Sequence, residues 1–267
     1  MLATEPEVKS MKTIVIKCGG SVIDQLTSEF FTSLKRLKAN GYQLVFVHGG
    51  GPDINEMLDY FQVKATFHNG LRKTTEEALE IVEMVLSGKT NRKLVQLLRE
   101  NGLNGIGLNG TDDNCINASI IDEEKLGLVG AVSKVNARLI YTLLEEALIP
   151  VITPLGITED GRKLNINADY VASAVAKYLH AEQCLFVTDV AGILIDGRIQ
   201  SVMAQEEINH FIETGQISGG MIPKVTSAIA ALESGLNSVM IVSGKKQFFD
   251  GEDLLGTKIV VKEGIIE

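Results

Sequence analysis

Two short apolar runs, residues 13–16 and 44–47, each end in a cluster of glycines. The clusters are Lys17-Cys18-Gly19-Gly20-Ser21 and His48-Gly49-Gly50-Gly51-Pro52. A strand that ends in glycines and leads towards a helix leaves backbone N–H groups open to an anion, and the helix N-terminus adds partial positive charge. These clusters therefore indicate a chain built from strand–helix units, and they predict phosphate chemistry at the strand ends, with Lys17 as a nearby cation.

The alternation of strand and helix patterns continues along the chain. Predicted helices include 28–39, 53–61 and 205–213, and predicted strands include 43–47, 149–153, 184–188, 238–242 and 258–261. Strands that alternate with helices form a mostly parallel sheet that is covered on both faces. We therefore expect an α/β fold, a three-layer αβα sandwich around a mostly parallel central sheet. One domain at 12–267 would comprise two lobes, about 12–165 and 166–267, and residues 1–11 would form a disordered leader.

Composition and charge narrow the classes of partner. The chain has 267 residues, 45% of them hydrophobic, which is enough for a substantial core. A net charge of -9 gives the surface no general attraction for nucleic acid or an anionic membrane, so we expect neither as a partner. No run approaches the roughly 20 apolar residues of a membrane span, and no secretory signal is recognisable. The three cysteines lack disulfide or metal spacing, which favours a reducing cytoplasm.

Three local patterns predict structure rather than function. Residues 105–110 match the dinucleotide pattern G-x-G-x-x-G, but a turn precedes them and a polar segment follows, so we predict a strand that leads into a loop. Gly88-Lys89-Thr90 resembles the end of a Walker A motif, yet Glu83 stands where its first glycine should be, which favours a break between two helical segments. Thr74 and Glu77 predict a capping box.

Six motifs, in order along the chain, carry a more specific signal. They are Ile16-Lys17-Cys18-Gly19-Gly20, Val47-His48-Gly49-Gly50-Gly51-Pro52, Asn69-Gly70-Leu71-Arg72, Asn165-Ile166-Asn167-Ala168-Asp169, Thr188-Asp189-Val190 and Gly219-Gly220-Met221-Ile222-Pro223-Lys224. Together they resemble the amino acid kinase family, over nearly the whole chain after Met11. The resemblance implies the amino acid kinase fold, with the amino-acid substrate on the N-lobe and ATP on the C-lobe.

The same resemblance implies an activity. A kinase of this kind would transfer the γ-phosphoryl group of ATP to the side-chain carboxylate of N-acetyl-L-glutamate, giving an acyl phosphate, in an early step of arginine biosynthesis. A carboxylate with a pKa near about 4.3 is already ionised at neutral pH, so it needs positioning and charge neutralisation rather than a general base. ATP implies Mg2+, held mainly by phosphates and water, so we expect no protein metal ligand.

The resemblance also assigns roles to residues. Lys17 would stabilise the phosphoryl group in transfer, Lys224 would neutralise the leaving phosphate, and Asp169 would lie between the two lysines and orient both. The residues implied to bind the amino-acid substrate are Gly50, Gly51, Arg72 and Asn165. Those implied to bind phosphate or nucleotide are Gly19, Gly20, Asn167, Asp189, Gly219 and Gly220.

Most of these residues also have a purely structural explanation. Tight turns with positive φ would account for the glycines, and the helix dipole favours a first-turn carboxylate such as Asp169. Asn167 has the character of an N-cap, and Arg72 that of a solvated side chain just before a helix.

Several functions stay open at this point. Within the same family these are aspartate, glutamate, carbamate and uridylate kinases, although residues 69–72 and Asn165 favour an N-acylated amino acid. From other classes, an NAD-dependent oxidoreductase would use residues 105–110, and a nucleotide-binding regulator would bind without turnover. The chain departs from the family at Ala191, where proline is common, and at 109–113, where a lysine-containing loop is usual. Relatives that arginine inhibits carry a longer N-terminal helix, so we expect a homodimer that arginine does not inhibit.

Overall fold

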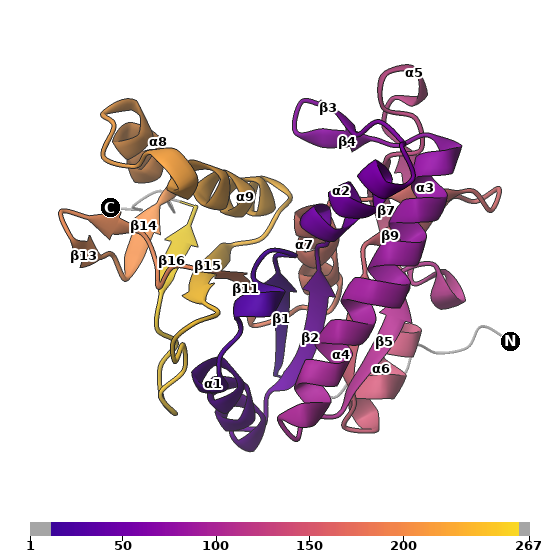
Figure 1. Cartoon of the computed structure of the whole chain (residues 1–267). Coiled ribbons are helices and arrows are strands. Elements are labelled where there is room, and N and C mark those ends of the chain that lie inside the picture. Colours follow the sequence, from indigo (N-terminus) through magenta and orange to yellow (C-terminus); the bar gives the residue numbers. More distant parts are fainter. Residues whose placement is uncertain (1–11, 262–267) are drawn as a thin grey trace, which may run out of the picture.

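The computed structural model describes residues 12–261, and it is organised around one eight-stranded sheet (Figure 1). In sheet order the strands are β14 (Val202–Ala204), β16 (Thr257–Val260), β15 (Ser238–Ser243), β11 (Gln183–Thr188), β1 (Thr13–Cys18), β2 (Gln43–His48), β8 (Ile149–Thr153) and β5 (Gly105–Asn109). All neighbours are parallel except β15 and β16. The mostly parallel sheet is therefore confirmed.

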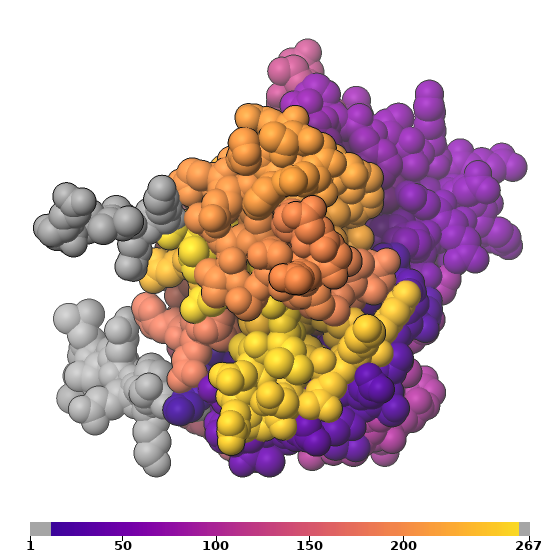
Figure 2. All heavy atoms as spheres, turned by 90° about the vertical axis from the view of Figure 1, so that its left-hand side faces the viewer, coloured from indigo at the N-terminus to yellow at the C-terminus, as the bar shows by residue number. Residues whose placement is uncertain are grey.

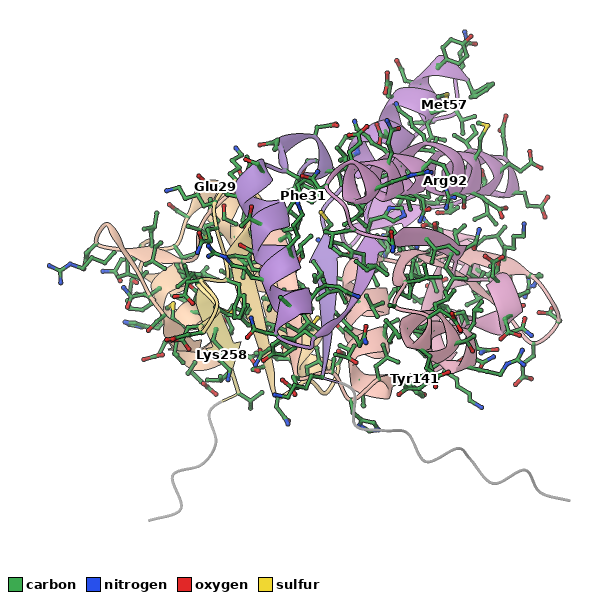
Figure 3. The ribbon with its side chains drawn as sticks, turned by 90° about the horizontal axis from the view of Figure 1, so that it is seen from below. Glu29, Phe31, Met57, Arg92, Tyr141 and Lys258 are labelled. Carbon is green, nitrogen blue, oxygen red and sulfur yellow. The ribbon has the colours of Figure 1, made fainter. Side chains whose placement is uncertain are left out.

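Helices cover both faces of this sheet. One face carries α1 (Ser28–Ala39) and α4 (Asn91–Glu100), and the other carries α6 (Arg138–Glu145), α7 (Ala168–Tyr178), α8 (Gln205–Glu213) and α9 (Ile222–Glu233). Alternate residues of β1 show the division, because Ile14 and Ile16 pack under the first set of helices and Val15 under the second. Figure 3 shows Arg92 on α4 and Tyr141 on α6 at opposite sides of the sheet. The three-layer prediction is confirmed.

Smaller elements complete the fold outside the central sheet and its covering helices. A second sheet has the order β10 (Lys163–Asn165), β9 (Leu155–Ile157), β6 (Ile116–Ile120) and β7 (Gly130–Val135). Two hairpins pair β3 (Thr66–His68) with β4 (Leu71–Lys73), and β12 (Leu194–Ile195) with β13 (Arg198–Ile199). The remaining helices are α2 (Gly51–Tyr60), α3 (Glu76–Glu83), α5 (Glu123–Leu126) and the short turns η1 (Ile23–Gln25), η3 (Asp112–Asn114) and η4 (Gly219–Met221).

Both halves of the chain contribute to the central sheet. Strand β1 pairs with β2 on one side and with β11, from the second half, on the other. Figure 2 shows the C-terminal part of the chain, in orange and yellow, over one face of the molecule. The division into lobes at residue 165 stays a prediction. The predicted leader at 1–11, on which the expectation about arginine inhibition depends, lies outside the described residues.

Two local predictions were wrong in detail. The segment around Gly88 is not a break, because η2 (Met84–Thr90) is a π-helix that joins α3 to α4 in one continuous helical run. The N-cap of α3 is Thr75 rather than Thr74, since the Thr75 hydroxyl accepts a hydrogen bond from Ala78 N at 3.2 Å. Thr74 is fully buried, and its hydroxyl donates a hydrogen bond to Arg72 O instead of accepting one from the helix.

The strand predicted within residues 105–110 is confirmed as β5. It pairs with β8 at the edge of the sheet and leads into η3 instead of a long helix. No helix N-terminus therefore follows these glycines, which a dinucleotide fingerprint requires. None of the helices in the described part of the chain has the length and apolar character needed to cross a bilayer.

Candidate active site

The two glycine clusters meet at the carboxyl ends of β1 and β2. A Cβ atom on Gly20 would lie 2.7 Å from Gly50 Cα, so the two loops are in backbone contact. A Cβ atom on Gly50 would lie 2.5 Å from Leu86 Cδ2, on the π-helix η2. Neither of these glycines has positive φ, and the same holds for Gly19 and Gly51. Close approach, rather than a left-handed turn, therefore explains why Gly20 and Gly50 carry no side chain.

Helix α2 begins at the second glycine cluster. Its first residues are Gly51 and Pro52, and no side chain caps its N-terminus. Proline fits this position because the first helical N–H groups have no partner within the helix. The remaining free N–H groups and the helix dipole make this end suitable for a negatively charged group.

Lys17 and Asp169 form an ion pair beside the first glycine cluster. Their Nζ and Oδ1 atoms are 2.8 Å apart, and only 18% and 13% of the two side chains are exposed. Lys17 comes from the end of β1, and Asp169 from the first turn of α7. Asn167 caps that helix, because its Oδ1 accepts a hydrogen bond from Asp169 N at 2.7 Å. The Lys17 ammonium also lies 5.6 Å from the centre of the Phe186 ring.

Lys224 pairs with a different carboxylate. Its Nζ lies 3.1 Å from Asp189 Oδ1 and donates a hydrogen bond to Gly220 O at 2.8 Å. The hydrogen bond from Lys224 is the main reason why the pKa of Asp189 is lowered. The resemblance predicts that Asp169 orients both lysines, whereas each lysine has its own aspartate in this structure. Lys17 and Asp169 thus come from β1 and α7, whereas Asp189 directly follows β11 and Lys224 lies on α9.

A cavity of about 220 Å³ lies on the side of the second glycine cluster, and we call it the first cavity. Its lining comprises Gly49, Gly50, Gly51, Ile54, Phe67, Gly70, Leu71, Arg72, Leu86, Val129, Pro154, Asn165, Ile166, Asn167 and Ala168. The structure thus brings together all four residues predicted to bind the amino-acid substrate. Asn167, which was expected on the nucleotide side, also lies here.

Arg72 carries the cationic charge of this cavity. It is 9% exposed, its Cζ lies 4.7 Å from the centre of the Phe67 ring, and its Nη2 donates to Asn55 Oδ1 at 2.6 Å. Its Nη1 is buried without a hydrogen-bond partner. Burial lowers the pKa of Arg72, but a guanidinium stays protonated in proteins. A buried guanidinium with a free donor is suited to a carboxylate ligand.

Thr74 connects two of the residues that line the first cavity. Its hydroxyl donates a hydrogen bond to Arg72 O at 2.8 Å and accepts one from Asn165 Nδ2 at 3.0 Å. The sequence interpretation missed Thr74 and Asn55 as site residues. Of two adjacent threonines before a helix only one can be its N-cap, and that spare hydroxyl was the available signal for Thr74.

A second cavity of about 340 Å³ lies on the side of the first glycine cluster. It is lined by Lys17, Gly19, Ser21, Val22, Gln25, Phe186, Val187, Thr188, Asp189, Gly220, Pro223, Lys224 and Ser227. Three of the six residues predicted to bind phosphate or nucleotide, Gly19, Asp189 and Gly220, thus line one cavity together with both lysines. Gly20 and Gly219 are not part of this lining, but each is adjacent in sequence to a residue that is.

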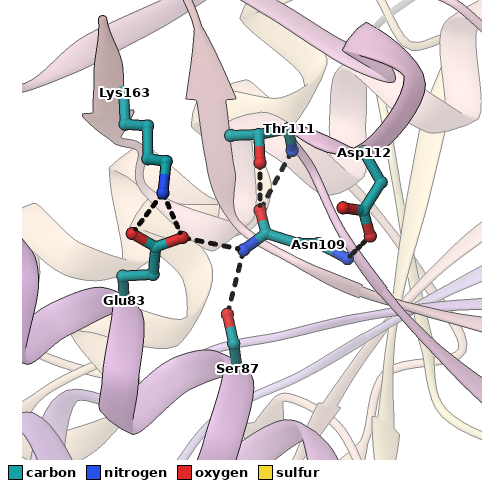
Figure 4. A network of polar contacts seen from close by, with 6 residues as sticks. All are labelled: Glu83, Ser87, Asn109, Thr111, Asp112 and Lys163. Carbon is teal, nitrogen blue, oxygen red and sulfur yellow. Dashed lines mark hydrogen bonds and ion pairs between the residues drawn. The ribbon is translucent and has the colours of Figure 1, made fainter.

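A polar network supports the far side of the first cavity (Figure 4). Lys163 Nζ donates to both carboxylate oxygens of Glu83 at 2.8 Å. Asn109 Nδ2 donates to Ser87 Oγ at 3.0 Å, and the Asn109 Oδ1 accepts from Thr111. Asn109 Nδ2 also lies 3.5 Å from Glu83 Oε1, so the network ties η2 and the end of β5, through Glu83 at the end of α3, to β10, the strand that ends in Asn165. Asn109 and Thr111 therefore help to hold η2 and β10, which both contribute to the lining of the first cavity.

Titratable groups near the glycine clusters have no arrangement for nucleophilic or metal chemistry. Burial raises the pKa of Cys18 to about 12, so its thiol is not a nucleophile at neutral pH. Burial lowers the pKa of His48 to about 4, and its Nε2 accepts from Asn91 Nδ2 at 3.1 Å. Residues 12–261 contain no group of three or more His, Cys, Asp or Glu side chains placed to hold a metal ion.

Fold and site together define a phosphoryl-transfer protein in which lysines, glycine amides and helix ends surround two adjoining cavities. The model of the amino acid kinase family matches residues 12–243, and the chain belongs to this family. It is 52% identical to the acetylglutamate kinase of Geobacillus sp. (strain WCH70), over 95% of this chain and 99% of that protein. It is 48% identical to the acetylglutamate kinase of Bacillus subtilis (strain 168), over 95% and 99% of the two chains.

Solved structures support the same assignment of the fold. The structure of smu.665 from Streptococcus mutans UA159 is 35% identical with a TM-score of 0.79, and covers 94% of this chain and 99% of that one. A carbamate kinase from Giardia lamblia bound to AMP-PNP is 18% identical with a TM-score of 0.60, over 94% of this chain and 98% of that chain. At that identity the likeness concerns the fold alone.

Proposed function

We propose that this protein transfers the γ-phosphoryl group of ATP to the side-chain carboxylate of N-acetyl-L-glutamate. The observation that carries the proposal is the first cavity, whose lining includes both a buried guanidinium with a free donor and the N-terminus of α2. A substrate with two carboxylates fits such a cavity, since each of these two groups offers donors to one carboxylate. The names of the relatives at 48–52% identity support the same substrate.

In this proposal Arg72 and Asn165 bind the acyl-amino acid near its α-carbon. Gly50 and Gly51 then receive the reacting carboxylate, which is ionised at neutral pH and attacks without a general base. The low barrier to attack depends on holding two anions close together in the right geometry. The buried apolar residues of the first cavity, such as Leu86 and Val129, keep water from the acceptor.

ATP occupies the second cavity, with its phosphates towards the first glycine cluster. Lys17, which lines the second cavity, stabilises the charge on the phosphoryl group in transfer, and Asp169 holds its ammonium in place. Lys224 neutralises the leaving phosphate, and Asp189 positions it. Gly19, Gly20, Gly219 and Gly220 contribute backbone N–H groups.

Mg2+ would accompany the nucleotide. Asp169 and Asp189 are both engaged by lysines, and residues 12–261 contain no cluster of carboxylates placed as a cage for the ion. This donor set fits a cation that arrives on the phosphates and keeps its waters, and such a cation supplies further charge neutralisation. The test is to measure turnover with and without added Mg2+, and we expect turnover only when Mg2+ is present.

Membership of the amino acid kinase family also leads us to propose that the protein is a cytoplasmic homodimer that acts in arginine biosynthesis. The three cysteines are free and buried, which suits a reducing compartment. Large apolar side chains are exposed near the end of α2, notably Tyr60 at 78% and Phe61 at 50%, and a second copy would cover such a surface. Light scattering coupled to gel filtration should give twice the mass of one chain, and a monomer would contradict the assembly.

The other activities have less support. An oxidoreductase would need residues 105–110 at a helix N-terminus, whereas they form an edge strand. Carbamate and uridylate offer no pair of carboxylates for Arg72 and the N-terminus of α2 in the first cavity. Aspartate and glutamate lack the acyl group, which the apolar lining of that cavity suits.

The test is an acceptor panel with MgATP and hydroxylamine, which traps an acyl phosphate as a hydroxamate. The panel contains N-acetylglutamate, N-acetylaspartate, glutamate, aspartate, carbamate and UMP. We expect hydroxamate from N-acetylglutamate far above the other acceptors. ADP production with carbamate or UMP, without hydroxamate from N-acetylglutamate, would defeat the proposal.

A further inference from the structure

The side chain that holds Arg72 is neutral. Its partner Asn55 lies on α2, and the Oδ1 atom of this amide accepts the 2.6 Å hydrogen bond from Arg72 Nη2. Among residues 12–261 no carboxylate forms an ion pair with Arg72. The guanidinium is therefore fixed in direction while its charge is left uncompensated.

Acidic residues are not scarce around this contact. Asp53 and Glu56 flank Asn55 on the same helix, yet both carboxylates face Lys89, at 3.1 and 2.9 Å from its Nζ. Asp53 also accepts a hydrogen bond from Thr90 Oγ1 at 3.0 Å. The two carboxylates next to Asn55 are thus engaged by Lys89, and α2 presents an amide to Arg72.

A carboxylate in place of this amide would change the cavity. Aspartate has nearly the shape of asparagine, and at 2.6 Å it would form a charge-assisted pair with the guanidinium. The substrate carboxylate would then have to compete with this aspartate for Arg72, and its contact with the guanidinium would contribute much less to the affinity. An uncompensated buried cation costs stability in the free protein, but it strengthens the binding of an anion.

We propose that Asn55 is a positioning residue that orients Arg72 through a neutral oxygen and so leaves the guanidinium charge for the α-carboxylate of the substrate. This inference rests on the proposed function. Helix α2 then has two roles. Its N-terminus at Gly51 faces the reacting carboxylate, and Asn55, about 6 Å further along the helix axis, orients Arg72 for the α-carboxylate.

The test measures binding by calorimetry for wild type and Asn55→Asp. The two ligands are N-acetylglutamate and its 1-amide, which has a neutral carboxamide at the α-position and keeps the side-chain carboxylate. We expect wild type to bind the diacid at least about tenfold more tightly than the amide, as a charge-assisted contact implies. In Asn55→Asp the affinity for the diacid should fall at least about tenfold, and the affinity for the amide should hardly change.

Two further variants separate charge from position. Asn104→Asp makes the same chemical change at an exposed residue next to the amino end of β5, at the opposite end of the sheet, and should leave both affinities as in wild type. Asn55→Ala removes the tether without adding a charge. It should weaken the diacid less than Asn55→Asp does, because Arg72 remains uncompensated.

The outcomes are distinct from those of the acceptor panel. Equal losses for both ligands in Asn55→Asp would show a merely structural role, and an unchanged preference for the diacid would also overturn the inference. Failure of wild type to prefer the diacid would do the same. The proposed function, in contrast, stands or falls on hydroxamate formation by wild type.

Discussion

Gly20 and Gly50 are in direct backbone contact: a Cβ atom on Gly20 would lie 2.7 Å from Gly50 Cα and 2.9 Å from Gly50 N. The loop after β1 borders the second cavity, and the loop after β2 borders the first. The contact between the two glycines therefore marks the boundary between the cavities. A group that passes from one cavity to the other crosses where both loops present backbone N–H groups, beside Lys17.

This contact makes Gly20 intolerant of a side chain. In Gly20→Ala the new methyl group meets backbone atoms, which cannot rotate away, so the loops must separate. We expect a loss of about 1–3 kcal/mol in the free energy of unfolding and a lower kcat. Gly88→Ala is the matched control, since its Cβ would meet nothing within 4 Å and its φ is not positive. Urea unfolding gives the free energy of unfolding of each variant, and steady-state kinetics gives its kcat. Equal effects in the two variants would contradict the close approach of Gly20 to Gly50.

The two lysines should act on kcat more than on KM. Lys17→Ala and Lys224→Ala each remove a cation from a place where charge develops, so we expect kcat to fall at least about 100-fold. The KM for N-acetylglutamate should change little, because neither lysine lines the first cavity. Steady-state kinetics with MgATP decides, and a near-normal kcat in either variant would remove that lysine from the mechanism.

Their effects on stability should differ. Lys17→Ala leaves the Asp169 carboxylate, only 13% exposed, without its cation, so we expect a measurable loss in the free energy of unfolding. Lys224 pairs with a carboxylate that is 44% exposed, and such pairs contribute about 0–1 kcal/mol. Urea unfolding of both variants should therefore rank Lys17→Ala as the less stable protein.

Local pattern predicted much of the fold. The apolar spacing predicted α1 at 28–39 and β8 at 149–153 with the observed bounds. In amphipathic helices and buried strands, the positions of the apolar residues within the element itself indicate which side is buried. The glycine clusters located the site for the same local reason, since strand ends, glycines and helix starts are consecutive in sequence.

Pairings between distant segments were not predictable in this way. In this structure the partner of Lys224 is Asp189 and not the predicted Asp169, and that pairing is set by how β11 and α9 pack. Asn55 lies in an ordinary helical pattern, and only the fold of the β3–β4 hairpin brings Arg72 to it. Side-chain roles that depend on tertiary contact leave no periodic trace in the sequence.

Protonation of His48 should limit stability in mild acid. Burial lowers the pKa of His48 from its usual 6.5 to about 4 in the folded protein, so between these values the unfolded chain binds a proton that the folded chain does not. The contribution of this neutral, buried side chain to stability is complete above about pH 6.5 and decreases as the pH falls towards 4, by at most about 1.4 kcal/mol per pH unit.

The measurement is the free energy of urea unfolding of wild type and His48→Gln at several values from about pH 7 to pH 5. The wild-type curve should decline more steeply than that of the variant. His210→Gln, which replaces a histidine on the outer helix α8, serves as the control and should keep the wild-type slope. Parallel curves for wild type and His48→Gln would contradict the assignment.

Thr74 should matter for substrate binding because its hydroxyl joins Arg72 to Asn165. Thr74→Val keeps the shape but removes both hydrogen bonds, and the Arg72 carbonyl and the Asn165 amide lose a buried partner. We expect the KM for N-acetylglutamate to rise about tenfold or more, with a smaller change in kcat, since an unmet buried polar group costs about 1–3 kcal/mol. Thr74→Ser retains the hydroxyl and should behave like wild type.

The neighbouring threonine distinguishes this role from simple destabilisation. Thr75→Val removes the N-cap of α3, which should lower the free energy of unfolding by about 1 kcal/mol while the KM for N-acetylglutamate stays as in wild type. If Thr74→Val and Thr75→Val had the same KM, the effect at Thr74 would reflect stability alone. A raised KM in Thr74→Val only, restored in Thr74→Ser, would instead locate the effect in the hydroxyl that holds Arg72 and Asn165 at the first cavity.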